Sequence, residues 1–257
     1  MTLVLIHSSC AAPPLWDRVR ENLTGIPVLA PALPGRASNP WPPDDGDRSV
    51  AAYARAVLAA MDREGIGAAT IAGHSLGGAI ALQIALEHPD RVLGLGLVCT
   101  GARLRVWPHA LDALAEGVRE AIDVMVAAWC GPRTNDRERI AIRRLMESVG
   151  TEQGHLDLCA CDAFDVMDRL GEIRARTQVI GASEDVLTPP KYARYLADHI
   201  PAARLTIEDG AGHALPMERP EAVAGELAVL WAATAPRPTA GREAGWGAEE
   251  SAGPLRS

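Results

Sequence analysis

One stretch of the chain decides the fold: Ala68-Ala-Thr-Ile-Ala-Gly73-His74-Ser75-Leu76-Gly77-Gly78-Ala-Ile-Ala-Leu-Gln83. A short apolar run leads into G-x-S-x-G and then into helix-forming residues, which predicts a strand, a tight turn and a helix. A serine on such a strained turn needs small neighbours two residues to either side, and Gly73 and Gly77 supply them. The turn would project the Ser75 hydroxyl out of the sheet as a nucleophile, beside the free N–H groups of a helix start.

The pentapeptide alone leaves other interpretations open. A plain glycine-rich turn between a strand and a helix has the same composition, and phosphate-binding loops are also rich in glycine. The segment lacks the Gly-Lys-Ser/Thr ending of a P-loop and the G-x-G-x-x-G spacing of a dinucleotide-binding turn. Residues elsewhere in the chain have to separate a nucleophile from a simple turn.

Two later loops carry the acid and the base that a serine nucleophile needs. Because a serine hydroxyl is a poor nucleophile near neutral pH, a base has to accept its proton. Asp185 and His213 each stand just past an expected strand, in the order serine, acid, histidine. We prefer Asp185 to its neighbour Glu184 because of its distance from the Pro-Pro helix start, and Glu184 stays the alternative. Of the seven histidines only His213 has both the order and the loop, so Ser75, Asp185 and His213 are the predicted catalytic residues.

Short apolar runs alternate with helix-patterned segments along the chain, which predicts an α/β fold with a mostly parallel sheet of about six strands flanked by helices. The runs are nearly all apolar, as in strands buried on both faces. The expected strands are Leu3–His7, Ile26–Ala32, Ala68–Ala72, Leu93–Cys99, Thr177–Ala182 and Arg204–Glu208. The expected helices between them are about Trp16–Asn22, Ser49–Glu64, Leu76–His88, Pro190–His199 and Glu221–Ala233. The order of the strands in the sheet does not follow from these patterns.

Residues 101–172 break this rhythm, because no strand is evident there. The helices expected in this segment are Trp107–Glu116, Val118–Trp129, Asp136–Val149 and Leu156–Leu170. A helical insertion between two parallel strands usually lies over the strand carboxyl ends, where such folds bind ligands. We therefore expect residues 1–100 and 173–234 to form the core and residues 101–172 a helical cap. Residues 235–257, rich in Ala, Gly, Pro, Arg and Glu, are predicted to be a disordered tail.

Composition limits the expected partners. The net charge is −8 without a basic stripe and only 4% of residues are aromatic, so nucleic acid is not an expected partner. The five cysteines show neither a disulfide framework nor a zinc motif. The N-terminal apolar run is shorter than the apolar core of a signal peptide, and no stretch could span a bilayer. We expect a cytoplasmic monomer or homodimer that binds a small molecule and needs no membrane, cofactor or metal ion.

Four motifs together resemble those of the α/β-hydrolase family, in particular its small capped esterases and lyases. They are Leu3-Val-Leu-Ile-His7, Ala-Gly-His-Ser-Leu-Gly-Gly, Glu-Asp-Val-Leu-Thr-Pro-Pro and Gly-Ala-Gly-His-Ala-Leu-Pro-Met-Glu-Arg-Pro. The resemblance covers residues 1 to about 233, and it implies hydrolysis of a carboxylic ester by a Ser-His-Asp triad through an acyl-enzyme. The chain opens on the strand that the family usually counts third, so the antiparallel edge hairpin of many relatives is expected to be absent.

The same resemblance implies an oxyanion hole made of two backbone N–H groups, those of Leu76 and Ser9. Two such donors contribute a few kcal/mol each, or roughly a hundredfold or more in rate. The family usually has His-Gly where this chain has His7-Ser8, so a hydroxyl is added near the reaction centre, and His7 is expected to hold the loop by hydrogen bonds. Plant-type hydroxynitrile lyases have Thr at the Ser8 position but also need Lys directly after the catalytic histidine, where this chain has Ala214. A lyase is therefore only a minor alternative.

The expected cap contains five large apolar residues: Trp107, Met125, Trp129, Phe164 and Met167. Such residues pack into a helical core or, if they face the sheet, line an apolar substrate pocket. Together with Ser8, the first four are the predicted substrate-binding residues, and Arg103 and Arg105 are the cations at the cap edge worth testing. The patterns do not name the ester.

Two other functions use the same features. Acyl transfer or perhydrolysis would intercept the acyl-enzyme with a nucleophile other than water, and the sequence does not say whether the cap excludes water. A ligand receptor built on a hydrolase fold would bind without turnover, and the complete Ser-Asp-His set argues against it.

Overall fold

The computed structural model of the chain describes residues 1–42, 46–118 and 120–235. Within them one parallel sheet has the strand order β2-β1-β3-β4-β5-β6. The strands are β1 (Leu3–Ile6), β2 (Val28–Leu29), β3 (Ala69–His74), β4 (Val92–Val98), β5 (Arg176–Ala182) and β6 (Arg204–Glu208). The predicted α/β class and six-stranded parallel sheet are confirmed, and every pair of neighbouring strands in this sheet is parallel.

The second strand is much shorter than the expected Ile26–Ala32. It pairs with β1 only through Val28 and Leu29. Pro27 and Pro31 flank this pair, and a proline has no N–H to donate to a ladder. β2 is an edge strand and its two residues are only half-buried. Its side chains therefore bury too little apolar surface to stabilise a longer pairing with β1.

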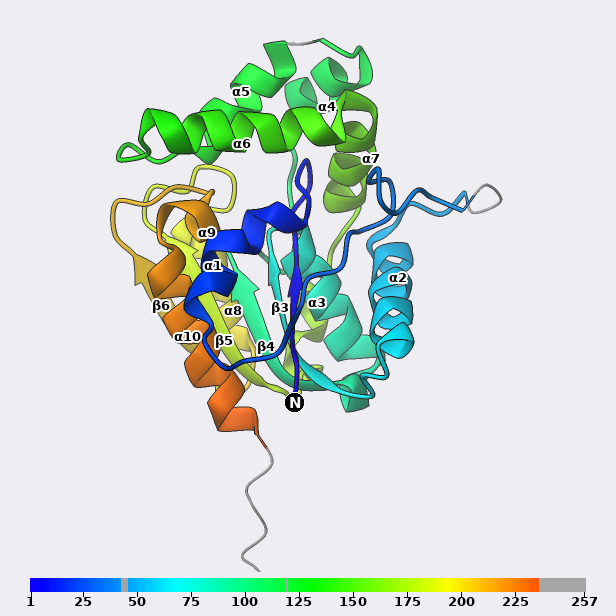
Figure 1. The fold of residues 1–257 in the computed structure, drawn as a ribbon, viewed down its shortest axis with the longest axis vertical. Helices are drawn as coiled ribbons and strands as arrows, with labels where there is room; N and C mark the ends of the chain where they lie inside the picture. Colours follow the sequence, from blue (N-terminus) through cyan, green and yellow to red (C-terminus); the bar gives the residue numbers. More distant parts are fainter. Residues whose placement is uncertain (43–45, 119, 236–257) are drawn as a thin grey trace, which may run out of the picture.

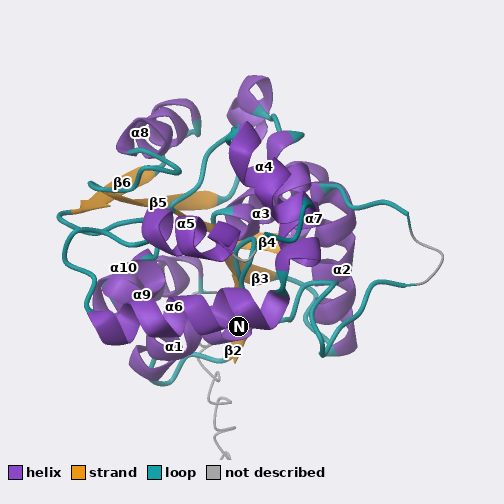
Figure 2. Ribbon diagram, turned by 90° about the horizontal axis from the view of Figure 1, so that it is seen from above, coloured by secondary structure: helices purple, strands orange, loops and turns teal. Residues whose placement is uncertain are grey.

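Side chains alternate between the two faces of the sheet. Along β1, Leu3 and Leu5 pack into one apolar cluster, whereas Val4 and Ile6 pack into the other, as the period of two in a strand requires. Helices α1 (Asp17–Asn22) and α10 (Pro220–Thr234) cover the first face. Helices α2 (Val50–Arg63), α3 (Leu76–Glu87) and α8 (Pro190–His199) cover the second. Figure 2 shows α8 and α10 on opposite sides of β5.

Four helices lie between β4 and β5 in the sequence: α4 (Pro108–Ala115), α5 (Glu120–Trp129), α6 (Asp136–Val149) and α7 (Thr151–Asp162). Figure 1 shows them gathered above the carboxyl ends of the strands, on the side away from the N-terminus. Met125 and Trp129 of α5 share an apolar cluster with α1 and α10, so these helices are packed onto the sheet domain. This arrangement supports the division into core and cap, with boundaries at residues 101 and 172, that we propose for the chain.

The helix expected over Leu156–Leu170 differs from the observed one. Helix α7 begins at Thr151, after Gly150 with φ of 81°, and ends at Asp162. Beyond it the Val166 N–H donates to the Ala102 carbonyl at 2.8 Å, so the chain runs beside the segment that leaves β4 before a 3₁₀ turn at Met167–Glu172. A tertiary contact has overridden the local helical pattern.

A short helix, α9 (Leu215–Glu218), was not expected and follows the His213 loop directly. Of the predicted tail at 235–257, all but Ala235 lies outside the described residues. None of the helices in the described ranges has both the length and the apolar character to cross a membrane.

Candidate active site

Ser75 stands on a strained turn between β3 and α3. Its φ of 53° and ψ of −115° lie in a region that costs a non-glycine residue about 1–3 kcal/mol. The turn is held because the Ser75 N–H donates to the Val98 carbonyl at 3.0 Å and Thr100 Oγ1 donates to the Ser75 carbonyl at 2.8 Å. A Cβ on Gly73 would lie 2.0 Å from the Gly77 carbonyl oxygen, which explains the small residue on that side of the turn.

His213 is oriented by the loop that follows β5. Its Nδ1 is 2.8 Å from Asp185 Oδ2. Thr188 Oγ1 donates to the same carboxylate oxygen at 2.7 Å, while the Leu187 and Thr188 N–H groups donate to Asp185 Oδ1, both at 2.9 Å. Because a carboxylate only accepts hydrogen bonds, Nδ1 carries the proton of the neutral imidazole and Nε2 keeps its lone pair.

Asp185 is buried, yet it stays ionised at neutral pH. Burial by itself raises the pKa of this carboxyl group, but the charge of His213 and the hydrogen bonds from His213 and Thr188 outweigh it, and the pKa falls well below the ordinary value. Glu184, the alternative acid, is exposed and accepts a hydrogen bond from the Ser183 hydroxyl at 3.1 Å. The geometry pairs Asp185 and not Glu184 with the histidine.

A second histidine supports the first from behind. His74 Nε2 is 2.7 Å from the His213 carbonyl oxygen, so Nε2 must carry the proton that it donates. Burial is the main cause that lowers the pKa of His74 to about 3, which keeps this ring neutral. The ring contacts Trp129 and His213, with centroids 5.6 and 4.8 Å away. His74 therefore holds the His213 backbone in place.

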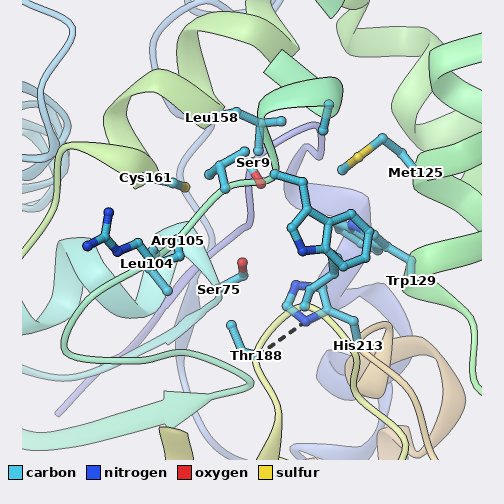
Figure 3. A pocket seen from close by; sticks show the side chains of 14 residues that line it. Ser9, Ser75, Leu104, Arg105, Met125, Trp129, Leu158, Cys161, Thr188 and His213 are labelled. Carbon is cyan, nitrogen blue, oxygen red and sulfur yellow. Dashed lines mark hydrogen bonds between the residues drawn. The ribbon is translucent and has the colours of Figure 1, made fainter. Parts of the chain in front are cut away.

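Ser75 and His213 line one cavity of about 60 Å³, which we call the nucleophile cavity. Figure 3 shows the Ser75 hydroxyl and the His213 ring facing the same space, with Met125 and Trp129 on one side. The Ser75 hydroxyl makes no hydrogen bond to another described residue, and the residue is 7% exposed. Catalytic hydrogen bonds often tighten only when substrate binds, so a free hydroxyl beside an oriented imidazole suits attack on a bound carbonyl group.

The structure brings most, but not all, of the predicted binding residues to this cavity. Ser9, Trp107, Met125 and Trp129 line it. Ser8 and Phe164 do not: both are buried, Phe164 in the cluster beneath α2 and α3, and the Ser8 hydroxyl has no hydrogen-bond partner among the described residues. Leu76 is the first residue of α3, so its N–H is one of those without an acceptor inside the helix. Further lining residues not singled out from the sequence are Leu104, Val106, Ala110, Leu158, Cys161, Leu187 and Thr188.

A buried ion pair fixes the loop that contains Ser9. Asp157 of α7 is 2.7 Å from Arg36 Nη2 and 3.0 Å from Arg36 Nη1. It also accepts hydrogen bonds from the Cys10 N–H, the Tyr53 hydroxyl and the Gln153 amide at 2.9, 2.6 and 2.9 Å. Both charged side chains are almost fully buried. The carboxylate thus has five donors around it and joins the cap to the core.

The arginine of this pair holds the same loop from the other side. Its Nε donates to the Ala11 carbonyl at 2.9 Å and its Nη2 to the Ser8 carbonyl at 3.3 Å. His7 acts as expected from the sequence: its Nε2 accepts from the Leu33 N–H and its Nδ1 donates to the Ser8 carbonyl, both at 3.0 Å. The backbone of Ser8, Cys10 and Ala11 is therefore fixed by hydrogen bonds to the side chains of His7, Arg36 and Asp157.

We expect Asp157→Asn to lower the free energy of unfolding by about 3 kcal/mol, because it leaves Arg36 buried without a counter-charge and turns an amide N–H₂ towards donors. The measurement is urea denaturation followed by circular dichroism. Asp112→Asn, an exposed acid of α4, serves as the control and should change stability by less than about 0.5 kcal/mol. Equal stability of the two variants would contradict this role of Asp157.

A buried glutamate joins the His213 loop to the cap. Glu218 accepts hydrogen bonds from the Gly131 N–H at 2.7 Å, from the Gly212 N–H at 2.5 Å and from the Thr134 hydroxyl. Gly131 and Gly212 pack so closely that a Cβ on either would lie within about 2.5 Å of the other's backbone. The Ala214 N–H also donates to the Trp129 carbonyl at 2.8 Å, so cap and histidine loop form one packed unit.

Sequence reasoning missed several residues that shape the site: Arg36, Asp157, Thr188 and Glu218. Thr188 and Glu218 stand inside motifs that were recognised, three residues after Asp185 and five after His213. Arg36 and Asp157 carry no local signal, because they are 121 residues apart and belong to different layers. Among the described residues, no group of three or more His, Cys, Asp or Glu side chains is placed so that it could bind a metal ion.

The chain is similar to known proteins over most of its length. The profile of the alpha/beta hydrolase family matches residues 3–226. A pimeloyl-[acyl-carrier protein] methyl ester esterase from Neisseria meningitidis is 30% identical over 239 residues, which is 86% of this chain and 89% of that protein. The solved structure of a thermophilic esterase is 32% identical with a TM-score of 0.80, over 91% of this chain and 90% of that one. An enol-lactonase from Burkholderia xenovorans LB400, 24% identical with a TM-score of 0.81 over 89% of this chain and 90% of that one, shares the fold.

Proposed function

This chain belongs to the alpha/beta hydrolase family, and on that premise we propose that it hydrolyses a carboxylic ester with Ser75 as nucleophile, His213 as general base and Asp185 as the group that orients the histidine. One observation carries the proposal: a serine in a strained conformation shares a cavity with an imidazole whose Nδ1 is bound to a buried carboxylate. Two of the proteins that resemble the chain, the Neisseria protein and the thermophilic enzyme, are esterases by name.

The reaction has two balanced halves. His213 Nε2 accepts the Ser75 proton while Oγ attacks the ester carbonyl carbon, and the tetrahedral intermediate collapses as the alcohol leaves with that proton. Water then gives a proton to His213 and attacks the acyl-serine, and the second collapse releases the carboxylic acid and restores the serine. Asp185 stabilises the imidazolium in both halves of the reaction and does not itself accept a proton.

The oxyanion of each tetrahedral intermediate needs two donors. We assign the backbone N–H groups of Leu76, at the start of α3, and of Ser9, on the loop that the buried ion pair holds. The α3 N-terminus adds its favourable dipole to the first donor. The Arg36–Asp157 pair supports the second donor, because it fixes the backbone on both sides of Ser9.

The small volume of the nucleophile cavity predicts a preference for short neutral acyl groups. About 60 Å³ is room for roughly four or five water molecules, and a longer neutral chain has to extend past the Arg105 side chain. We expect kcat/KM on p-nitrophenyl esters to be highest between acetate and butyrate and at least about tenfold lower for decanoate, because the longer neutral chain would partly desolvate the Arg105 guanidinium without pairing its charge.

This chain-length series also tests the proposed function. Spectrophotometric release of p-nitrophenol that depends on the enzyme supports ester hydrolysis, and absence of turnover on every ester would remove the proposal. The structure does not support the alternative hydroxynitrile lyase function. A lyase would use the hydroxyl at position 8 to hold its substrate, but the Ser8 hydroxyl is buried and does not line the cavity. Mandelonitrile should therefore release no cyanide.

A further inference from the structure

A second cavity adjoins the nucleophile cavity, and one side chain, Arg105, lines both. The second cavity has a volume of about 300 Å³. Figure 3 shows Arg105 and Leu104 on the opposite side of Ser75 from Met125 and Trp129. Because Arg105 belongs to both linings, a substrate that extends from Ser75 past this side chain would reach the second cavity.

The second cavity combines apolar walls with cations. Its walls come from Ala102, Met167, Tyr192 and Tyr195, and its charged lining residues are Arg103, Arg105 and Lys191. No acidic side chain of the described residues lines either cavity. The chain as a whole is acidic, with 33 Asp and Glu against 25 Lys and Arg. The second cavity therefore has a positive charge although the net charge of the protein is negative.

Among the described side chains, two of the three cations lack a counter-charge. Arg103 Nε is 3.3 Å from Asp165 Oδ2, whereas Arg105 and Lys191 form no ion pair within residues 1–42, 46–118 and 120–235. Both of these side chains are exposed, and Lys191 is the only lysine in the sequence. An anion bound in this cavity can form charge-assisted hydrogen bonds with these side chains, and a guanidinium can bind a carboxylate through two N–H groups at once.

We propose that the second cavity binds a carboxylate that the substrate carries at the end remote from the scissile ester bond, with Arg105 and Lys191 as its ligands. The inference rests on the proposed function and narrows the substrate class from esters in general to esters with an anionic tail. The tail belongs to the acyl group or to the alcohol, and the same chemistry would recognise it in either place.

The test compares matched pairs of esters that differ only in the terminal charge. In the acyl arm the pair is mono-p-nitrophenyl adipate and p-nitrophenyl hexanoate. In the alcohol arm it is the acetate ester of 4-hydroxybutyrate and butyl acetate, followed in a pH-stat. We expect kcat/KM for the charged ester to be about tenfold higher in one arm, mainly through KM, and this ratio to shrink in 0.5 M salt because exposed charges are screened.

Three variants locate the effect. Arg105→Gln and Lys191→Gln should each reduce the charged-to-neutral ratio by about threefold or more, which matches the loss of one partly screened ionic contact. Arg63→Gln removes an equal charge from the far end of α2 and should leave the ratio unchanged. If the charged-to-neutral ratio of kcat/KM is near one in both arms while the neutral esters are still hydrolysed, the proposed anion site is wrong and the proposed ester hydrolysis is unaffected.

A binding measurement keeps the site testable even if every ester resists hydrolysis. Sulfosuccinimidyl acetate should modify only Lys191 and the N-terminal amine, and peptide mass spectrometry then quantifies Lys191 alone. Millimolar adipate should slow modification of Lys191 at least about threefold, whereas neutral hexane-1,6-diol should not. Equal rates with both compounds would overturn the inference independently of any catalytic result.

Discussion

Ser75→Ala is expected to lower kcat on p-nitrophenyl acetate by about 10⁵- to 10⁶-fold, which is the size of effect that removal of a serine nucleophile has in hydrolases. The variant keeps the cavity and the two backbone donors, so a small residual rate over water should persist. Ser9 and Thr188 also line the cavity. Neither stands on the strained turn between β3 and α3, and the Thr188 hydroxyl already donates to Asp185 Oδ2, so we expect neither to replace Ser75.

A covalent probe can show whether the expected loss of activity reflects removal of the Ser75 hydroxyl. A fluorophosphonate should label the native protein on the peptide that contains Ser75 and should not label the Ser75→Ala variant. Ser148→Ala, which replaces an exposed serine on α6, is the matched control and should keep both activity and labelling. Turnover or labelling that survives the Ser75 substitution undiminished would falsify the assignment of the nucleophile.

Asp185→Asn should lower kcat by about 10⁴-fold, because it selects the wrong tautomer of His213. Asp185 Oδ1 accepts two backbone N–H groups, from Leu187 and Thr188, so the amide oxygen of the asparagine has to stay at that position. Its N–H₂ group then faces His213 Nδ1, which has to accept instead of donate. The proton moves to Nε2, and the imidazole can no longer take the proton of Ser75.

Glu184→Gln is the control for this prediction and also tests the alternative acid. Glu184 is exposed and bonded to Ser183, so its substitution should change kcat by less than about twofold. Circular dichroism of both variants checks that the fold is retained. A larger loss from Glu184→Gln than from Asp185→Asn would show that the acid has been misassigned.

The parts of the site that were predictable share one property: their signals are local. The glycines at 73 and 77 indicate a tight turn at Ser75, where the backbone φ is positive. Such a turn packs closely against its immediate neighbours, so it requires small residues at those nearby positions. Strand positions followed from apolar runs for the same reason. Asp185 and His213 were singled out because each directly follows such a run.

The parts that were not predictable depend on contacts between distant segments. Phe164 and Trp129 look alike as apolar cap residues, yet Phe164 belongs to the buried apolar cluster that includes α2 and α3, while Trp129 lines the nucleophile cavity. The α7 helix stops at Asp162 because the following backbone bonds to Ala102. Neither outcome follows from a window of a dozen residues, since both depend on which surface the segment meets.

By itself, then, the amino-acid sequence determined the parallel α/β architecture, and it predicted a serine, an acid and a histidine in the order that a hydrolase of this kind needs. Only the tertiary structure decided that the Arg36–Asp157 pair holds the Ser9 loop and that Arg105 lines two cavities. The physical reason is range: backbone periodicity and turn strain act within a few residues, whereas burial of a charge or the shape of a cavity is settled by packing between segments more than a hundred residues apart.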